Sequence, residues 1–162
     1  MEFNIKYYIY FWFMGMFSKS AEYAIRAVFY IAKSTQLGRK VGIKEIAGNI
    51  QSPEPFLGKI LQELSKGGIV KSIKGPNGGF YLTEVEMNKR LSEVVKAIDG
   101  DDIFIGCGMG LPQCSEEFPC PLHNEFKAIR SELNRVLNSI TLGQFNDELI
   151  LGSLKLNRIE KK

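Results

Sequence analysis

Five turn-forming residues, Gly75-Pro76-Asn77-Gly78-Gly79, separate two short runs that are rich in β-branched and aromatic side chains. Glycine and asparagine tolerate a positive backbone φ, so a turn of this composition can join two antiparallel strands. The flanking runs, Ile69–Ile73 and Phe80–Thr83, therefore predict a β-hairpin. A lone hairpin is not stable in water, so the residues around it must supply the core.

The residues before the hairpin carry apolar side chains at helical spacing in three successive segments. Phe17–Ser34 predicts a first helix, and Val41–Ile50 predicts a short second one. A third helix begins in Ser52-Pro53-Glu54-Pro55, with the serine as N-cap, and stops at Gly67-Gly68. Three helices followed by a hairpin form a winged helix-turn-helix domain, which we assign to residues 17–90 of a mainly α fold.

In a winged helix the third helix enters the major groove of DNA and the hairpin, the wing, lies against the phosphate backbone. Residues 17–90 hold 12 Lys and Arg against 6 Asp and Glu, whereas residues 91–162 hold 8 against 11. The first half is therefore the candidate for binding a polyanion. A winged helix that binds only proteins is the alternative. The candidate DNA-binding residues are Ser52, Glu54, Pro55, Phe56, Lys59, Lys71, Lys74, Gly75, Pro76, Asn77, Gly78 and Gly79.

All three cysteines and the only histidine lie in the segment from Cys107 to His123, with Cys114 and Cys120 between them. Thiolate and imidazole are common metal ligands, and these four residues are the candidate metal site. The gaps of six and five residues between the cysteines are longer than those in most structural zinc sites. Zinc and a metal-free thiol switch stay open as alternatives. An odd number of cysteines argues against a secreted disulfide framework and favours the cytoplasm.

Residues 91–120 predict a short helix, Leu91–Ile98, and the cysteine loop, Asp101–Cys120. A long helix, Pro121–Leu142, follows within a segment that we assign to residues 121–155, and residues 156–162 read as a flexible tail. The apolar residues of this helix recur in alternating steps of four and three, which is a heptad seam that predicts a homodimer. Packing across its own domain is the alternative. The seam residues are Leu122, Phe126, Ile129, Leu133, Val136 and Ile140.

The first 16 residues form an N-terminal extension with an apolar run, Tyr7–Met14, that is too short to span a bilayer. It also lacks the features of a signal peptide. Either translation starts at Met16, or the extension is an aromatic arm that packs on a partner. No membrane association is expected.

Four segments together resemble the IscR/NsrR (Rrf-type) family of bacterial winged-helix regulators: Ser18–Ile25, Lys74–Tyr81, the three-cysteine loop and Asn138–Leu142. The resemblance implies a dimeric transcription regulator, with repression as the expected mode. It also implies an iron–sulfur cluster, 2Fe–2S or 4Fe–4S, that senses iron status, nitric oxide or redox state.

The cysteines would hold this cluster. The resemblance offers two candidates for the fourth ligand: His123, and Glu22 in the first helix, where some members of the family place an acidic ligand.

Other function classes find less support in the sequence. The glycine-rich turn lacks the Gly-Lys-Ser/Thr ending of a nucleotide-binding P-loop, and there is no second cluster motif or Ser/His/Asp arrangement. We therefore expect no enzyme activity. A sensory subunit that acts through protein partners is the remaining alternative.

Overall fold

The computed structural model describes residues 16–157. Residues 1–15 of the predicted N-terminal extension and residues 158–162 of the predicted tail lie outside the described part. Among the described helices, none combines the length and the apolar composition that a membrane span requires.

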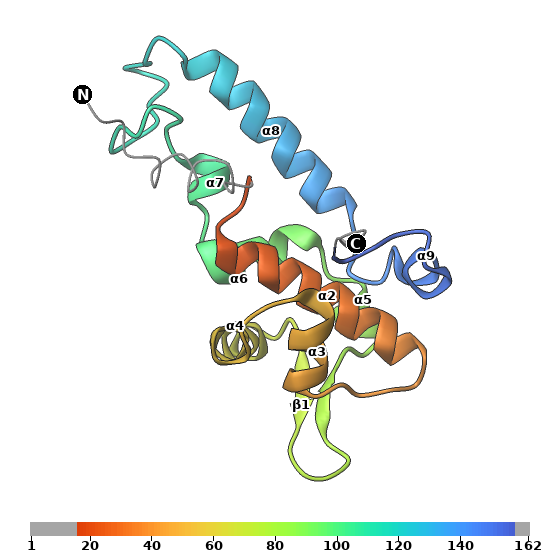
Figure 1. The fold of residues 1–162 in the computed structure, drawn as a ribbon. Helices are drawn as coiled ribbons and strands as arrows, with labels where there is room; N and C mark the ends of the chain where they lie inside the picture. The colour runs from red at the N-terminus through yellow and green to blue at the C-terminus, as the bar shows by residue number, and fades with distance from the viewer. Residues whose placement is uncertain (1–15, 158–162) are drawn as a thin grey trace, which may run out of the picture.

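The chain is mainly helical and contains one β-hairpin, which confirms the predicted fold class. Figure 1 shows α2, α3, α4 and the hairpin gathered at one end, with α8 extending away from them. The elements, in order, are α2 (Lys19–Gln36), α3 (Ile43–Ile50), α4 (Glu54–Lys66), β1 (Lys71–Ile73), β2 (Gly79–Tyr81), α5 (Glu84–Met87), α6 (Leu91–Asp99), α7 (Asp102–Ile105), α8 (His123–Ser139) and α9 (Asn146–Leu151).

Helix α2 is the centre of the core, because it contacts α3, α4, α6, α9 and strand β2. Its inner face consists of small and β-branched side chains that are fully buried: Ala24, Ala27, Val28 and Ile31. Alanine lets neighbouring helices approach closely, while the larger side chains fill the space between them. Helices α3 and α4 thus both pack against α2.

The turn between α3 and α4 differs from the predicted one. Gln51 has a left-handed conformation, with φ of 54°, and ends α3. Helix α4 begins at Glu54, and its N-cap is Pro53, so Ser52 does not cap it. The Ser52 N–H instead donates to the Ala47 carbonyl, and its hydroxyl is buried without a hydrogen-bond partner among the described residues. Proline at the cap position moves the serine one residue too far back to reach the open N–H groups.

An isolated β-bridge, which the sequence did not indicate, extends the two-stranded wing at Val41. Strands β1 and β2 pair antiparallel, with Lys71 opposite Tyr81. Val41, which was predicted to begin the second helix, forms a bridge with Phe80 through two backbone hydrogen bonds of 3.1 and 2.9 Å. Pairing with β2 satisfies the backbone of Val41, whose side chain is fully buried. The wing is thereby attached to the start of α3.

Behind the wing, Glu86 is a buried carboxylate in the one-turn helix α5. Its carboxylate accepts hydrogen bonds from the Thr83 N–H (2.9 Å) and hydroxyl (2.6 Å), and it lies 3.6 Å from Lys71 Nζ. Burial opposes ionisation, but the hydrogen bonds from Thr83 and the Lys71 charge outweigh it and hold the pKa of Glu86 below its ordinary value. The Thr-x-x-Glu pattern was the local signal for this helix.

Replacing Glu86 with glutamine should destabilise the protein in a pH-dependent way. A carboxylate whose pKa is lowered by folding stabilises the native state above its ordinary pKa, and this contribution is lost as the pH falls through the folded value. We expect E86Q to reduce the free energy of unfolding by roughly 1–3 kcal/mol at pH 7, with a smaller difference below pH 4. Urea unfolding at both pH values tests this. The exposed Glu84→Gln on the same helix is the control, and an equal effect at both pH values would contradict the assignment.

Helix α8 ends at Ser139 rather than at the predicted Leu142. Ile140 is extended, and its carbonyl accepts a hydrogen bond from the Leu91 N–H, while the Leu142 N–H donates to the Lys89 carbonyl. Leu142 is fully buried by this change of direction. Pairing with the start of α6 therefore replaces the last helical turn, because it buries a leucine and satisfies backbone groups that a helix end leaves open.

The predicted seam of α8 divides into two stripes. Leu133 and Ile140 are half-buried and pack against the core of the same protomer, as does the buried Leu137, which lies outside the seam. The other stripe repeats every seven residues and is exposed, to 44, 61 and 36% of its surface, at Leu122, Ile129 and Val136. Two seam residues thus pack against the core of the protomer and three face away from it, while the sixth, the half-buried Phe126, lies beside Gly108.

Candidate metal centre and nucleic-acid interface

The first residues of the predicted cysteine loop, Asp101–Cys120, form the one-turn helix α7, so the cysteine loop of the structure is the connection from α7 to α8, residues 106–122. In Figure 1 it lies at the end of α8 that is far from the wing. A cavity of about 770 Å³ between the loop and these two helices is lined by Cys107, Cys114 and Arg130, among others. A second cavity of about 260 Å³ is lined by Cys114, Arg130 and His123. Cys114 and Arg130 therefore lie between the two cavities.

The four candidate ligands of this loop form two pairs. Cys114 Sγ lies 3.4 Å from His123 Nδ1, and the Cys120 side chain is near enough to Cys107 to help lower the pKa of its thiol. His123 is only 5% exposed. Its Nε2 lies 3.4 Å from a Glu116 carboxylate oxygen but makes no hydrogen bond among the described residues. A buried ring nitrogen whose polar neighbour is this one carboxylate contact is a candidate to bind a ligand.

The pKa of the Cys107 thiol is held below its ordinary value. The backbone N–H groups of Met109 and Leu111 contribute most, burial opposes them, and the Cys120 side chain and the Arg130 charge add to the effect. The thiolate is the form of cysteine that binds metals. The local backbone therefore prepares Cys107 to act as a ligand.

Arg130 is a residue of this site that the sequence analysis did not identify. Its Nη2 donates to Cys114 Sγ at 3.2 Å, and its Nη1 is buried without a hydrogen-bond partner in the described chain. Arg130 lies two helical turns after His123, on the same face of α8. That spacing was the available signal. A guanidinium at this position offsets the negative charge of nearby thiolates.

The chemistry of the loop fits an iron–sulfur cluster better than its present geometry does. Thiolates and a buried imidazole are suitable donors. Within residues 16–157, however, no three His, Cys, Asp or Glu side chains are close enough together to hold one metal ion. The pair formed by Cys107 and Cys120 would therefore have to move toward the pair formed by Cys114 and His123. Glycines at 106, 108 and 110 make such a movement of the loop possible.

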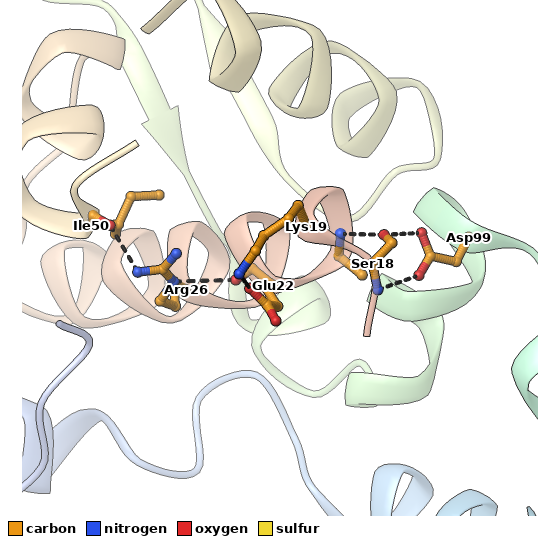
Figure 2. Close-up of polar contacts among 7 residues, drawn as sticks. Ser18, Lys19, Glu22, Arg26, Ile50 and Asp99 are labelled. Atoms are coloured by element: carbon orange, nitrogen blue, oxygen red, sulfur yellow. Dashed lines mark hydrogen bonds and ion pairs between the residues drawn. The ribbon is translucent and has the colours of Figure 1, made fainter. Parts of the chain in front are cut away.

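Glu22, the other candidate for the fourth ligand, is not brought to the cysteines within one protomer. It lies in the first turn of α2, and its carboxylate pairs with Lys19 Nζ at 2.6 Å (Figure 2). His123 is the candidate that this structure places beside a cysteine. Ligation by Glu22 would require a different arrangement of α2 and the loop, or a second protomer.

Two further side chains of α2 contact the segment that leads into α4. Arg26 Nη1 donates to the Ile50 carbonyl at 2.9 Å, as Figure 2 shows, and its guanidinium lies 4.8 Å from the centre of the Tyr23 ring. Tyr23 packs edge-on against Phe56 of α4, with 5.8 Å between the ring centres. The position of α2 therefore affects where α4 begins. An arginine close to the apolar stripe of α2 was the only sequence signal for these contacts.

Helix α4 has the two faces that a DNA-reading helix needs. One face is buried in the core by Leu57, Ile60, Leu61 and Leu64. The other carries the exposed candidates Glu54, Pro55, Phe56 and Lys59. The buried face thus fixes the helix to the core, and the opposite face of its first two turns is exposed to solvent.

The lysines near the wing do not have equal roles. Lys74 lies exposed beside the turn, whereas Lys71 is close to the buried Glu86 and contributes to the fold. Lys40 and Lys44, which the sequence analysis did not identify, are exposed on either side of Val41. Lys40 Nζ lies 5.7 Å from the centre of the Tyr81 ring of β2. Exposed lysines therefore lie on the wing, on α4, before α3 and within α3, in the same domain as the candidate DNA-binding residues.

Gly79 permits the close approach of the wing to Val41. Its φ is +142°, and a Cβ at this position would lie 2.9 Å from the Val41 carbonyl oxygen. We expect Gly79→Ala to destabilise the protein by roughly 1–3 kcal/mol through backbone strain, and to remove hydrogen-exchange protection from the Val41 and Phe80 amides. Exchange measured by mass spectrometry tests this. Gly48→Ala in α3, where nothing lies within 4 Å, is the control, and unchanged wing protection in G79A would contradict the prediction.

Comparisons with known proteins agree with this architecture. Residues 17–148 match the Rrf2 family, described as iron-dependent transcriptional regulators. A protein of Aquifex aeolicus that bears the name of an HTH-type transcriptional regulator is 31% identical over 129 residues, covering 78% of this chain and 88% of that protein. The regulator IscR of Klebsiella pneumoniae is 27% identical over 135 residues, covering 83% and 82%.

Two solved structures share the fold. CymR of B. subtilis, a global cysteine regulator, superposes with a TM-score of 0.66 at 22% identity, covering 83% of this chain and 98% of that one. T. potens IscR gives a TM-score of 0.62 at 21% identity, covering 89% and 92%. The family match spans the winged helix, the cysteine loop and most of the C-terminal helices, so this chain belongs to the Rrf2 family of transcriptional regulators.

Proposed function

We propose that this transcription regulator is a dimeric repressor that senses iron–sulfur status, nitric oxide or redox state through an iron–sulfur cluster. Its ligands are Cys107, Cys114, Cys120 and either His123 or Glu22. The proposal rests on the pairing of Cys114 with the buried His123, whose Nε2 makes no hydrogen bond among the described residues. DNA and reduced thiols occur together in the cytoplasm, where we expect this regulator to act.

The bound cluster would supply a redox-active centre that nitric oxide and oxidants can reach. The residues of the chain supply everything else. The loop thiolates would hold the cluster. Arg130 offsets their negative charge and orients Cys114. His123 anchors the first turn of α8 to the loop. A non-thiolate fourth ligand exchanges more readily than a cysteine, which suits a sensor.

DNA recognition is assigned to α4 and the wing. The exposed residues at the start of α4, Glu54–Phe56 and Lys59, would face base edges in the major groove, whereas the hydroxyl of the candidate Ser52 is buried in the turn before the helix. The wing residues Lys74 through Gly79 would lie against the phosphate backbone. Lysine–phosphate contacts make affinity fall steeply with salt. In a dimer formed through the exposed stripe of α8, two copies of α4 would read the two halves of a palindromic site.

Cys107 and Cys120 are both free cysteines, and Cys120 is near enough to affect the pKa of Cys107, which favours a thiol switch as the second candidate. In that reaction a hydroperoxide would accept two electrons and two protons from the two thiols and be reduced to an alcohol and one water, or to two waters in the case of hydrogen peroxide. One S–S bond would form, and Cys114 would stay free. Zinc bound by the same residues is the third candidate, and a measurement of the metal content separates it from the other two.

The proposal is tested by purifying the protein without oxygen and measuring iron, acid-labile sulfide and zinc. Iron together with sulfide is the expected result, while zinc alone or no metal would overturn the cluster assignment. A gel-shift assay on the promoter of its own gene, before and after cluster removal, tests regulation. Absence of a specific complex in both states would contradict the repressor assignment.

His123→Ala and Glu22→Ala, compared by visible absorption, separate the two fourth ligands. The variant that loses or shifts the cluster bands identifies the ligand. Unchanged spectra in both variants would exclude both residues.

A further inference from the structure

Ser18 and Asp99 join the start of α2 to the end of α6. The Ser18 hydroxyl donates to one Asp99 carboxylate oxygen at 2.5 Å, and the Ser18 N–H donates to the other at 3.3 Å. The same hydroxyl oxygen accepts a hydrogen bond from the Ala21 N–H at 3.0 Å and so caps α2. Asp99 therefore holds the residue that caps α2. Figure 2 shows these contacts at one end of the helix.

Asp99 also lies where the cysteine loop connects to the domain. It is the last residue of α6, and the next residue, Gly100, ends that helix with a positive φ of 74°. Helix α7 and the loop follow directly. A movement of the loop that reaches the end of α6 changes the position of the Asp99 carboxylate. Because both oxygens of that carboxylate hold Ser18, the first turn of α2 must move with it or lose its contacts.

The contacts further along α2 extend this connection to α4. Arg26 holds the Ile50 carbonyl, and Tyr23 packs on Phe56, both within two turns of Ser18. Helix α2 is one continuous helix that is buried along one face. A displacement of its first turn is thus passed to the start of the helix that carries the DNA-binding candidates.

We infer that Asp99 is a positioning residue that links the conformation of the cysteine loop to the position of α2, and through α2 to α4, within a single protomer. This inference rests on the proposed function in that the loop is the sensing element. It does not require Glu22 to be a ligand, because Ser18 and Asp99 make the connection by themselves. Asp99 thereby provides a connection between the loop and the first helix that is separate from ligation by Glu22.

The experiment compares the full chain with Asp99→Ala, using Asp101→Ala as the matched control. Asp101 also carries a carboxylate, at the start of α7, but it pairs with Lys96, a residue of the adjacent α6. All three cysteines lie in the loop, so iodoacetamide alters the loop alone, without a need for the cluster. Affinity for the promoter duplex and hydrogen exchange of residues 19–23 are measured before and after alkylation.

In the wild type and in D101A, we expect alkylation to change the promoter affinity by about fivefold or more, the usual lower range of coupling between two sites. Exchange in the first turn of α2 should change with it. In D99A both responses should disappear while the melting temperature stays near that of D101A. If D99A unfolds, Asp99→Asn, which keeps one acceptor, should show a reduced response.

The outcomes separate the inference from the proposed function. Equal responses in D99A and D101A, or no response of α2 in the wild type, would overturn the role of Asp99. If no duplex is bound specifically by any protein, the repressor assignment fails. Hydrogen exchange in α2 then still decides whether Asp99 transmits the loop conformation.

Discussion

Cys114→Ser protein purified without oxygen should contain only a small fraction of the iron and acid-labile sulfide found in the wild type. Cys114 lies between the two cavities and contacts both His123 and Arg130, so its loss removes one ligand and the partner of two other residues. A serine hydroxyl is a far poorer ligand for iron than a thiolate at neutral pH. Iron and sulfide assays, with visible absorption, measure the effect.

The control for this substitution is Met109→Leu, an exposed residue of the same loop that preserves side-chain volume. It should keep the wild-type content of iron and sulfide. Replacing Arg130 with alanine should give an intermediate result, because Arg130 orients Cys114 without being a ligand. Full iron and sulfide in C114S would contradict the assignment of Cys114.

Ile129→Glu should convert the proposed dimer into a monomer. Ile129 lies in the middle of the exposed stripe of α8 and is 61% exposed in the single protomer. In a symmetric dimer the substitution acts twice, and each buried isoleucine is worth roughly 1.5–3 kcal/mol. The dissociation constant of the dimer should therefore rise by about a hundredfold or more. Sedimentation over a range of protein concentrations measures it.

Asn124→Glu, an exposed position outside the stripe on the same helix, is the matched control and should leave the assembly unchanged. Because Ile129 makes little contact with its own protomer, I129E should retain its fold. A helical circular dichroism spectrum checks this. A wild-type protein that is monomeric at all concentrations, or an I129E protein that still dimerises, would show that this stripe is not the dimer interface.

For helix α4, the sequence predicted one feature correctly and another incorrectly. Its apolar spacing predicted the buried face correctly, since Leu57, Ile60, Leu61 and Leu64 are buried as a helical period requires. The same reasoning assigned the cap to Ser52, which is wrong, because that serine belongs to the turn after Gln51. Local patterns predict the face of a helix better than its ends, where tertiary contacts compete with capping.

The candidate site divides in the same way. The cysteines and His123 stand out by residue type and by their position in one loop. Arg130, Arg26 and Asp99 do not stand out in this way. Each is important because of a contact with a residue that is distant in the sequence. Residue type alone cannot identify contacts of this kind.

The sequence by itself determined the order of helices and wing, the donor atoms of the loop and the apolar seam of α8, because these depend on local periodicity and on the chemistry of single residues. Only the tertiary structure decided that Val41 pairs with the wing, that α8 ends at Ser139, and that half of the seam faces away from the protomer. The reason is physical. Backbone groups and apolar side chains can be satisfied by several partners, and the packing of the whole chain selects among them.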